Sequence, residues 1–93
     1  MFTGIVEEVG TVVAVEPFAQ GRRITVRASA VLADLRIGDS IALDGVCQTV
    51  VARDESTFTV EAIRTTLART TLGEFGPGRP VNLERPVAAG GRF

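Results

Sequence analysis

The stretch Arg23-Ile24-Thr25-Val26-Arg27-Ala28 indicates the fold class of this chain most clearly. Its apolar and polar residues alternate strictly, which places three apolar side chains on one face and three polar ones on the other. This period of two is typical of a strand that buries one face. The rest of the sequence has the same character, because thirteen valines and ten threonines favour strands, while ten glycines and four prolines interrupt them. We therefore expect an all-β protein.

Outward from that strand, five more segments are predicted to be strands. Turn signals separate them, and the clearest is Asp44-Gly45, a pair typical of tight hairpins. A glycine within a strand pattern suggests a bulge or a bend, and Gly10 occupies such a position in the first strand. The five segments are residues 5–15, 40–43, 46–53, 57–63 and 81–87.

Two short segments are predicted to be helical. Residues 65–72 form the better candidate, with Thr65 as the N-cap and Gly73 as a stop in the left-handed conformation. Residues 30–35 are predicted to form one helical turn or a short 3₁₀ helix. Six short strands with one or two short helices favour a small six-stranded antiparallel Greek-key barrel, and a two-sheet sandwich is the alternative. The chain of 93 residues is predicted to be a single domain, 1–93, in which the tail 88–93 has no obvious role in the core.

The composition excludes several classes of function. The chain has no histidine and a single cysteine, so an intrachain disulfide and a cysteine zinc cluster are excluded. Ten positive charges, all arginine, are set against eleven acids, which argues against a nucleic-acid surface. No apolar run approaches the ~20 residues that cross a bilayer. The amino terminus has none of the features of a signal peptide, and we expect a cytoplasmic location.

Five short phrases, in order along the chain, give a more specific indication. They are MFTGIVEEVG at 1–10, GDSIALDGVCQTV at 38–50, FTVE at 58–61, TLARTTLG at 66–73 and VNLERP at 81–86. This series resembles the amino-terminal lumazine-binding domain of riboflavin synthase, over nearly the whole chain. Each phrase alone is weak, and five together are hard to obtain by chance.

The resemblance implies a reaction and a partner. Members of that family carry two similar six-stranded barrels and convert two molecules of 6,7-dimethyl-8-ribityllumazine into riboflavin and a pyrimidinedione. The reaction transfers four carbons and needs no metal or redox cofactor. This chain corresponds to one such barrel, so we expect it to bind a lumazine or riboflavin and to pair as a homodimer, with a trimer as the alternative. A stand-alone carrier or sensor without turnover is the second hypothesis, and a structural or oligosaccharide-binding barrel is the third.

The resemblance also implies where the ligand lies. Backbone groups and hydroxyls suit the amide-like edges of a lumazine ring and its ribityl chain. Three segments correspond to the ligand-lining positions of the family, and no catalytic residue is assigned. The segments are Gly4, Ile5 and Val6; Cys47, Gln48 and Thr49; and Glu61, Ala62, Ile63, Arg64, Thr65 and Thr66.

Each of these positions also has an ordinary structural interpretation. Cys47 is equally typical of a small buried hydrophobe, and Thr49 of a plain strand residue. Glu84-Arg85, like Asn82, is interpreted as structural, with Arg85 near a rim or an interface. The chain also departs from the family, which usually has an apolar residue at the position of Gln48, Pro-Glu at positions 64–65, where this chain has Arg-Thr, and often Asp at the position of Glu61. These departures suggest a shifted ligand preference or a loss of turnover.

Overall fold

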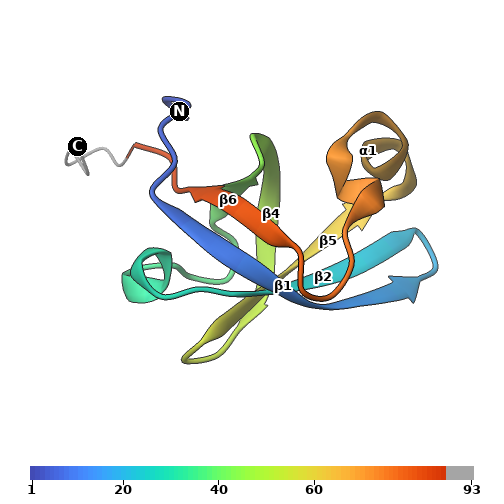
Figure 1. Cartoon of the computed structure of the whole chain (residues 1–93), viewed down its shortest axis with the longest axis horizontal. Coiled ribbons are helices and arrows are strands. Elements are labelled where there is room, and N and C mark those ends of the chain that lie inside the picture. The colour runs from blue at the N-terminus through green and yellow to red at the C-terminus, as the bar shows by residue number, and fades with distance from the viewer. Residues whose placement is uncertain (88–93) are drawn as a thin grey trace.

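The computed structural model describes residues 1–87 of the chain. Its strands pair in the order β1-β2-β5-β4-β3-β6 and close into a barrel, as Figure 1 shows. All neighbouring strands in this ring pair in antiparallel fashion. The elements are β1 (Glu8–Phe18), β2 (Gly21–Arg27), the 3₁₀ helix η1 (Ala30–Ala33), β3 (Ser40–Leu43), β4 (Val46–Arg53), β5 (Thr57–Ile63), α1 (Arg64–Arg69), the 3₁₀ helix η2 (Thr71–Glu74) and β6 (Pro80–Glu84).

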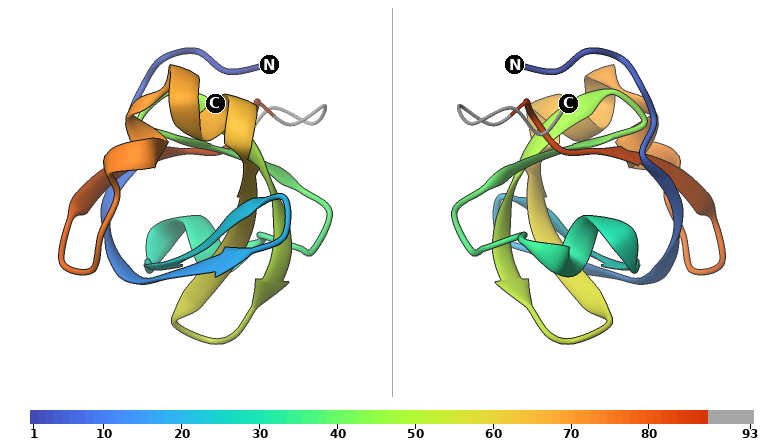
Figure 2. Two further views of the ribbon diagram at one scale, coloured as in Figure 1. Left: turned by 90° about the vertical axis from the view of Figure 1, so that its right-hand side faces the viewer. Right: turned by 90° about the vertical axis from the view of Figure 1, so that its left-hand side faces the viewer.

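The predicted Greek-key barrel is confirmed and the sandwich alternative is wrong. Strands β3, β4 and β5 follow one another as hairpins, and β2 then lies beside β5 rather than beside β3, which is the Greek-key arrangement. Figure 2 views the barrel from its two ends, with the strands around a common interior. The predicted tail, 88–93, lies outside the described residues.

The β3–β4 hairpin has the tight turn that Asp44-Gly45 predicts. Asp44 has a φ of 48° and Gly45 a φ of 83°, so both residues adopt left-handed conformations. Such a pair matches the twist of the flanking strands, and it sets the register in which Leu43 pairs with Val46. The predicted bounds of β3, β4 and β5 are confirmed as well.

The core fills the barrel with side chains from all six strands, η1 and η2. Phe58 is its largest member and is completely buried. The alternation predicted for β2 is confirmed, because Ile24 and Val26 are buried, while Arg23 and Arg27 are exposed. The other buried members are Val12, Val31, Leu32, Leu35, Ile41, Leu43, Val50, Val60, Ala62, Leu72, Phe75, Val81 and Leu83.

The predicted boundaries of three strands are wrong. The first strand begins three residues later than predicted and extends to Phe18, because it pairs with β2 up to the hairpin turn. The second begins at Gly21, not at residue 23, and ends at Arg27. The last strand ends at Glu84 rather than at residue 87, since the backbone N–H of Arg85 donates to the carboxylate of Glu7 and leaves the ladder.

Gly10 is required for a close approach rather than for a bulge. A Cβ at this position would lie 2.7 Å from Leu83 Cδ1 and 2.8 Å from the carbonyl oxygen of Arg27. The bulge of β1 lies further along, between Val12 and Ala14. Gly10 thus lets β1 pass closely between its two neighbours.

The predicted helix is shorter than expected and starts differently. It ends at Arg69 because Thr70 is extended, with a φ of −136°, and η2 follows. The N-cap is Ile63, without a side-chain cap, so the prediction for Thr65 is wrong. Gly73 lies within η2 and does not have a positive φ. It is needed because a Cβ there would collide with the carbonyl oxygen of Leu67.

We predict that Gly21→Ala destabilises the barrel by about 1–3 kcal/mol, the usual range for overpacking. Its Cβ would collide with the carbonyl oxygen of Ala62 and approach Ile63, so β2 and β5 must move apart. Gly76→Ala is the matched control, because its Cβ meets no atom within 4 Å and its φ is not positive. Chemical denaturation measures both variants, and equal stability of the two would contradict the close approach.

Candidate functional site

A buried carboxylate holds the amino-terminal segment against the barrel. Glu84, at the end of β6, is 6% exposed. Its Oε2 accepts hydrogen bonds from the backbone N–H of Thr3 at 2.6 Å and from the Thr3 hydroxyl at 2.8 Å, and its Oε1 accepts from the N–H of Gly4 at 3.1 Å. Burial opposes ionisation of Glu84, but these three donors outweigh it and hold the pKa of the carboxyl below its usual range. Residues 3 and 4 are therefore fixed by a charged anchor.

Arg85, the residue that follows β6, holds Glu7, the residue that precedes β1. Arg85 Nη2 lies 3.0 Å from Glu7 Oε2, and both side chains are largely buried. Arg85 Nη1 also bonds Asp34 Oδ1 at 2.7 Å, which connects the segment after η1. The hydrogen bonds to Glu7 raise the pKa of Arg85 despite its partial burial. Glu84 and Arg85 together fix residues 3–7.

Strand β3 connects this anchor to the second predicted segment. Ala42 pairs with Glu84 on one side and with Cys47 on the other. Adjacent strands are ~4.8 Å apart, so the backbones of Glu84 and Cys47 are separated by about 10 Å. Residues 3–6 and the beginning of β4 therefore lie at the same end of the barrel, on the upper side of Figure 1.

The pairing between β4 and β5 stops at that end. Val50 pairs with Val60, and among residues 1–87 no pair of these two strands extends further toward the start of β4. Residues 46–49 continue to pair with β3, and residues 61–63 with β2, on their outer sides. The two inner edges diverge, as Figure 1 shows for β4 and the end of β5 beneath α1. We call residues 46–49 and 61–63 the β4–β5 seam.

The β4 side of the seam presents two side chains outward and one inward. Cys47 and Thr49 are exposed, and Gln48 lies on the opposite face of the strand, between Val46 and Val50. The interpretation of Cys47 as a buried hydrophobe is therefore wrong. Gln48 donates from Nε2 to the carbonyl oxygen of Cys47 at 2.7 Å.

The β5 side of the seam presents residues of three kinds. Glu61 Oε2 is engaged by Arg23 at 2.6 Å, a partly exposed ion pair. Ala62 is completely buried in the core, so its side chain is not positioned to contact a ligand directly. Ile63 is 53% exposed. Of the predicted residues on β5, Ile63 is thus the one that presents an accessible apolar side chain.

The beginning of α1 is tied to the β1–β2 turn. Arg64 donates from its backbone N–H to Gln20 at 3.0 Å and from Nη2 to the carbonyl oxygen of Ala19 at 2.9 Å. Thr65 is exposed and Thr66 is half-buried on the first turn. The Arg64 guanidinium therefore binds the hairpin, while the two threonines follow the end of the seam.

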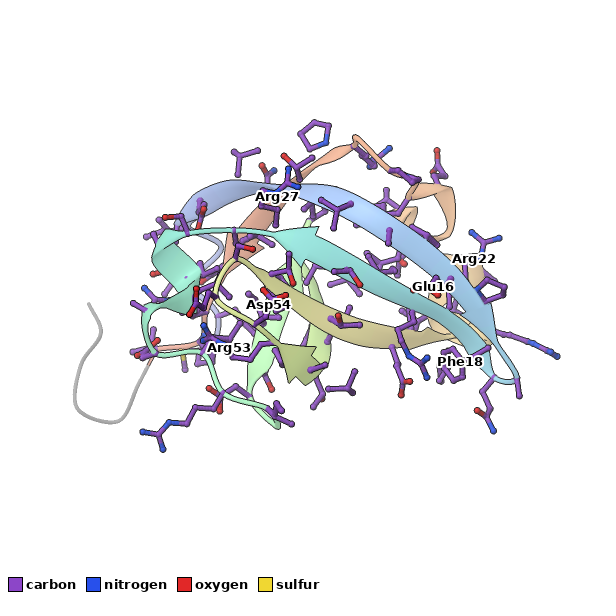
Figure 3. All side chains as sticks on the ribbon, turned by 90° about the horizontal axis from the view of Figure 1, so that it is seen from below. Glu16, Phe18, Arg22, Arg27, Arg53 and Asp54 are labelled. Atoms are coloured by element: carbon purple, nitrogen blue, oxygen red, sulfur yellow. The ribbon has the colours of Figure 1, made fainter. Side chains whose placement is uncertain are left out.

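A surface hollow of about 470 Å³ lies between the β1–β2 hairpin and α1. Figure 3 labels Phe18 and Arg22, which contribute to its hairpin side. The hollow shares only Arg64 with the predicted ligand residues. Its other lining residues are Pro17, Gly21, Leu67, Ala68 and Gly73. The predicted ligand residues and the lining of this hollow therefore overlap only at Arg64, the first residue of α1.

Sequence reasoning missed the anchor of the site. No contact is predicted for Thr3. The structural interpretation of Glu84 and Arg85 fits their contacts, but the sequence does not reveal that these contacts hold Thr3, Gly4 and Glu7. A signal was present in the last phrase, where two charged residues directly follow an alternating strand. The partner of each charge lies about 80 residues away, which no local pattern reveals.

Comparison with known proteins gives the family. The geometry defines a closed Greek-key β-barrel domain in which the β4–β5 ladder ends at Val50 and Val60. A family model described as the lumazine binding domain matches residues 3–86. The chain belongs to this lumazine-binding domain family.

Sequence relatives agree with that family, and a solved structure shares the barrel fold. The chain is 46% identical over 93 residues to a riboflavin synthase of Actinobacillus pleuropneumoniae and 50% identical over 94 residues to one of Mycobacterium bovis. The whole chain is matched, but it spans only 43% and 47% of these relatives. The crystal structure of LumP complexed with 6,7-dimethyl-8-(1'-D-ribityl) lumazine gives a TM-score of 0.83 at 20% identity, over 90% of this chain and 48% of LumP, so the two share the barrel fold.

Residues 1–87 lack two further features. No helix there is both long and apolar enough to cross a membrane. No group of three or more His, Cys, Asp or Glu residues in the same range is arranged to hold a metal ion.

We predict that acid releases the amino-terminal segment. The pKa of Glu84 is lowered by folding, so its stabilising contribution is present above the ordinary value of 4.5 and is lost as the pH falls through the lower value of the folded state. NMR should show the amide signals of Thr3 and Gly4 shifting in this acidic range, and their hydrogen exchange, corrected for pH, becoming faster. Glu84→Gln should abolish the titration. An acid transition that Glu84→Gln retains would contradict the assignment.

Proposed function

We propose that this chain is the lumazine-binding barrel of a riboflavin synthase-type enzyme. It binds one molecule of 6,7-dimethyl-8-ribityllumazine or riboflavin at the β4–β5 seam. Family membership and the riboflavin synthase relatives support the ligand class. The observation that supports the location is the end of the β4–β5 ladder at Val50 and Val60, since residues 47–49 and 61–66 continue from it on the two strands and into α1.

The seam offers the chemistry that such a ligand requires. A pteridine ring has amide-like edges, and the facing edges of β4 and β5 carry backbone donors and acceptors that are not used in a ladder between the two strands. Exposed Ile5 and Val6 provide apolar surface for the ring. We assign the ribityl chain to the hydroxyls of Thr49, on β4, and Thr66, on the first turn of α1.

We predict a stoichiometry of one riboflavin per barrel. Titration should change riboflavin fluorescence, and Thr49→Val and Thr66→Val should each weaken binding by about 0.5–1.5 kcal/mol, the value of one net hydrogen bond. Cys47→Ser should keep the fold and weaken binding less than Thr66→Val. Thr11→Val is the control, since β1 lies opposite β4 in the ring of strands.

Two results would count against this proposal. The first is the absence of any fluorescence change with riboflavin or lumazine at protein concentrations of tens of micromolar. The second is an equal loss of affinity in Thr11→Val and Thr66→Val, which would mean that the effect does not come from the seam.

A homodimer is the arrangement that we propose for the partner. Ile5, Val6 and Ile63 are 60%, 48% and 53% exposed, respectively, an unusual exposure for large apolar side chains within one predicted site. In a two-fold dimer, the surface formed by these side chains packs against the same surface of the second chain. Light scattering should detect a dimer at high concentration, and a strict monomer there would contradict this arrangement.

The second candidate function is a carrier or sensor that binds without turnover. It is favoured by the composition, because the dismutation removes a proton from a ring methyl group and this chain contains neither histidine nor lysine. The reaction also needs two lumazines face to face, a positioning that one barrel alone does not provide. The proposed cytoplasmic location suits both candidates.

We predict that the 93-residue chain turns over lumazine slowly or not at all. The test incubates the pure chain with 6,7-dimethyl-8-ribityllumazine and follows riboflavin by absorbance over hours, beside a two-barrel riboflavin synthase. Comparable rates would overturn the carrier function and establish the chain as a full catalyst.

A further inference from the structure

The amino-terminal segment reaches the seam end of the barrel without forming part of a strand. Residues 1–7 precede β1, and chain ends of this kind stay mobile unless specific contacts tie them down. Gly4 has a φ of 85°, and a Cβ there would meet no atom within 4 Å. The turn at Gly4 is thus selected by backbone conformation and by its hydrogen bonds, not by packing.

One carboxylate supplies most of those bonds. Glu84 accepts both N–H groups of the turn and the Thr3 hydroxyl, through its two oxygens. The Thr3 hydroxyl oxygen in turn accepts from the N–H of Ile5 at 3.1 Å, so the network extends to the next residue. The Met1 carbonyl accepts from Val87 at 2.7 Å and adds a tie outside the turn.

From this network we infer that Glu84 is a positioning residue for the ligand, acting through Thr3 and Gly4. It holds the backbone of Gly4, Ile5 and Val6 in the conformation that faces the bound ring. This inference rests on the proposed function, because it requires the ligand to lie at the seam. It extends that function by assigning a ligand role to two residues outside the three predicted segments, Thr3 and Glu84.

The physical reason is the entropy of ordering. A segment that must be fixed when the ligand binds reduces affinity by the free energy of its ordering. Glu84 fixes the segment beforehand, with a buried, ionised acceptor whose hydrogen bonds are stronger than neutral ones. Loss of the charge leaves the segment attached through Met1 and Glu7 but not ordered at the turn.

The test measures riboflavin affinity for Glu84→Gln, Thr3→Val and Thr3→Ser by fluorescence titration. A glutamine has one acceptor oxygen where Glu84 has two, and we expect its Kd to rise roughly three- to tenfold, the effect of one net hydrogen bond. Thr3→Val should weaken binding to a similar extent, because it removes the hydroxyl bonds without loss of volume. Thr3→Ser retains the hydroxyl and should bind like the wild type.

Asp54→Asn separates positioning from general stability. Asp54 caps the β4–β5 turn in the same way, with its Oδ1 accepting from the N–H groups of Ser56 and Thr57 at 2.9 and 2.7 Å. That turn lies at the lower side of Figure 1, away from the amino terminus, and Figure 3 labels Asp54 there. We expect Glu84→Gln and Asp54→Asn to lower Tm alike, but only Glu84→Gln to weaken binding.

The outcomes are distinguishable. A wild-type chain that binds neither riboflavin nor lumazine overturns the proposed function and this inference with it. A wild-type chain that binds, together with unchanged Kd values in Glu84→Gln and Thr3→Val, overturns the positioning role alone. Equal weakening in Glu84→Gln and Asp54→Asn also overturns it, because the effect would then follow stability. If Glu84→Gln does not fold, the Thr3→Val and Thr3→Ser pair decides the question.

Discussion

The closure of the barrel by β6 is the constraint on which the rest of the structure depends. This five-residue strand pairs with β1 on one side and with β3 on the other, so it joins the two ends of the sheet. Closure buries Val81 and Leu83 in the core and removes the free edges that a short open sheet would expose. It also places Glu84 and Arg85 beside the amino-terminal segment, where they bond Thr3, Gly4 and Glu7.

The ladder between β4 and β5, in contrast, ends before the two strands do. Strands β4 and β5 are continuous over their own lengths, yet they pair with each other only from Val50 and Val60 to the turn. A bulge at Val51 accompanies the change in register, and the strands diverge beyond it. The barrel is thus closed around its core, although β4 and β5 are not paired along the seam. The ligand that we propose for this seam follows from the family of the chain.

Most of the fold could be predicted from local patterns. The alternation in β2, the Asp44-Gly45 turn and the bounds of β3, β4 and β5 follow from period and turn chemistry, which are short-range properties. The boundaries of β1, α1 and β6 could not be predicted from local patterns. The turn at Gly4 precedes β1, and the extended backbone of Thr70 ends α1. The end of β6 depends on a distant partner, because Arg85 bonds Glu7. At the candidate site, the resemblance predicted the three segments. The contact between Glu84 and Thr3 could not be predicted, because these residues lie 81 positions apart in the sequence.

The most direct test of the account maps the ligand on the whole chain. Amide NMR spectra of the protein, recorded with and without riboflavin, report which backbone groups the ligand perturbs. The account predicts the largest shifts at residues 4–6, 47–49 and 61–66, with Thr3 affected through the Glu84 network. Shifts centred on Phe18, Arg22 and Leu67 would place the ligand in the hollow between the β1–β2 hairpin and α1 and contradict the assignment of the seam.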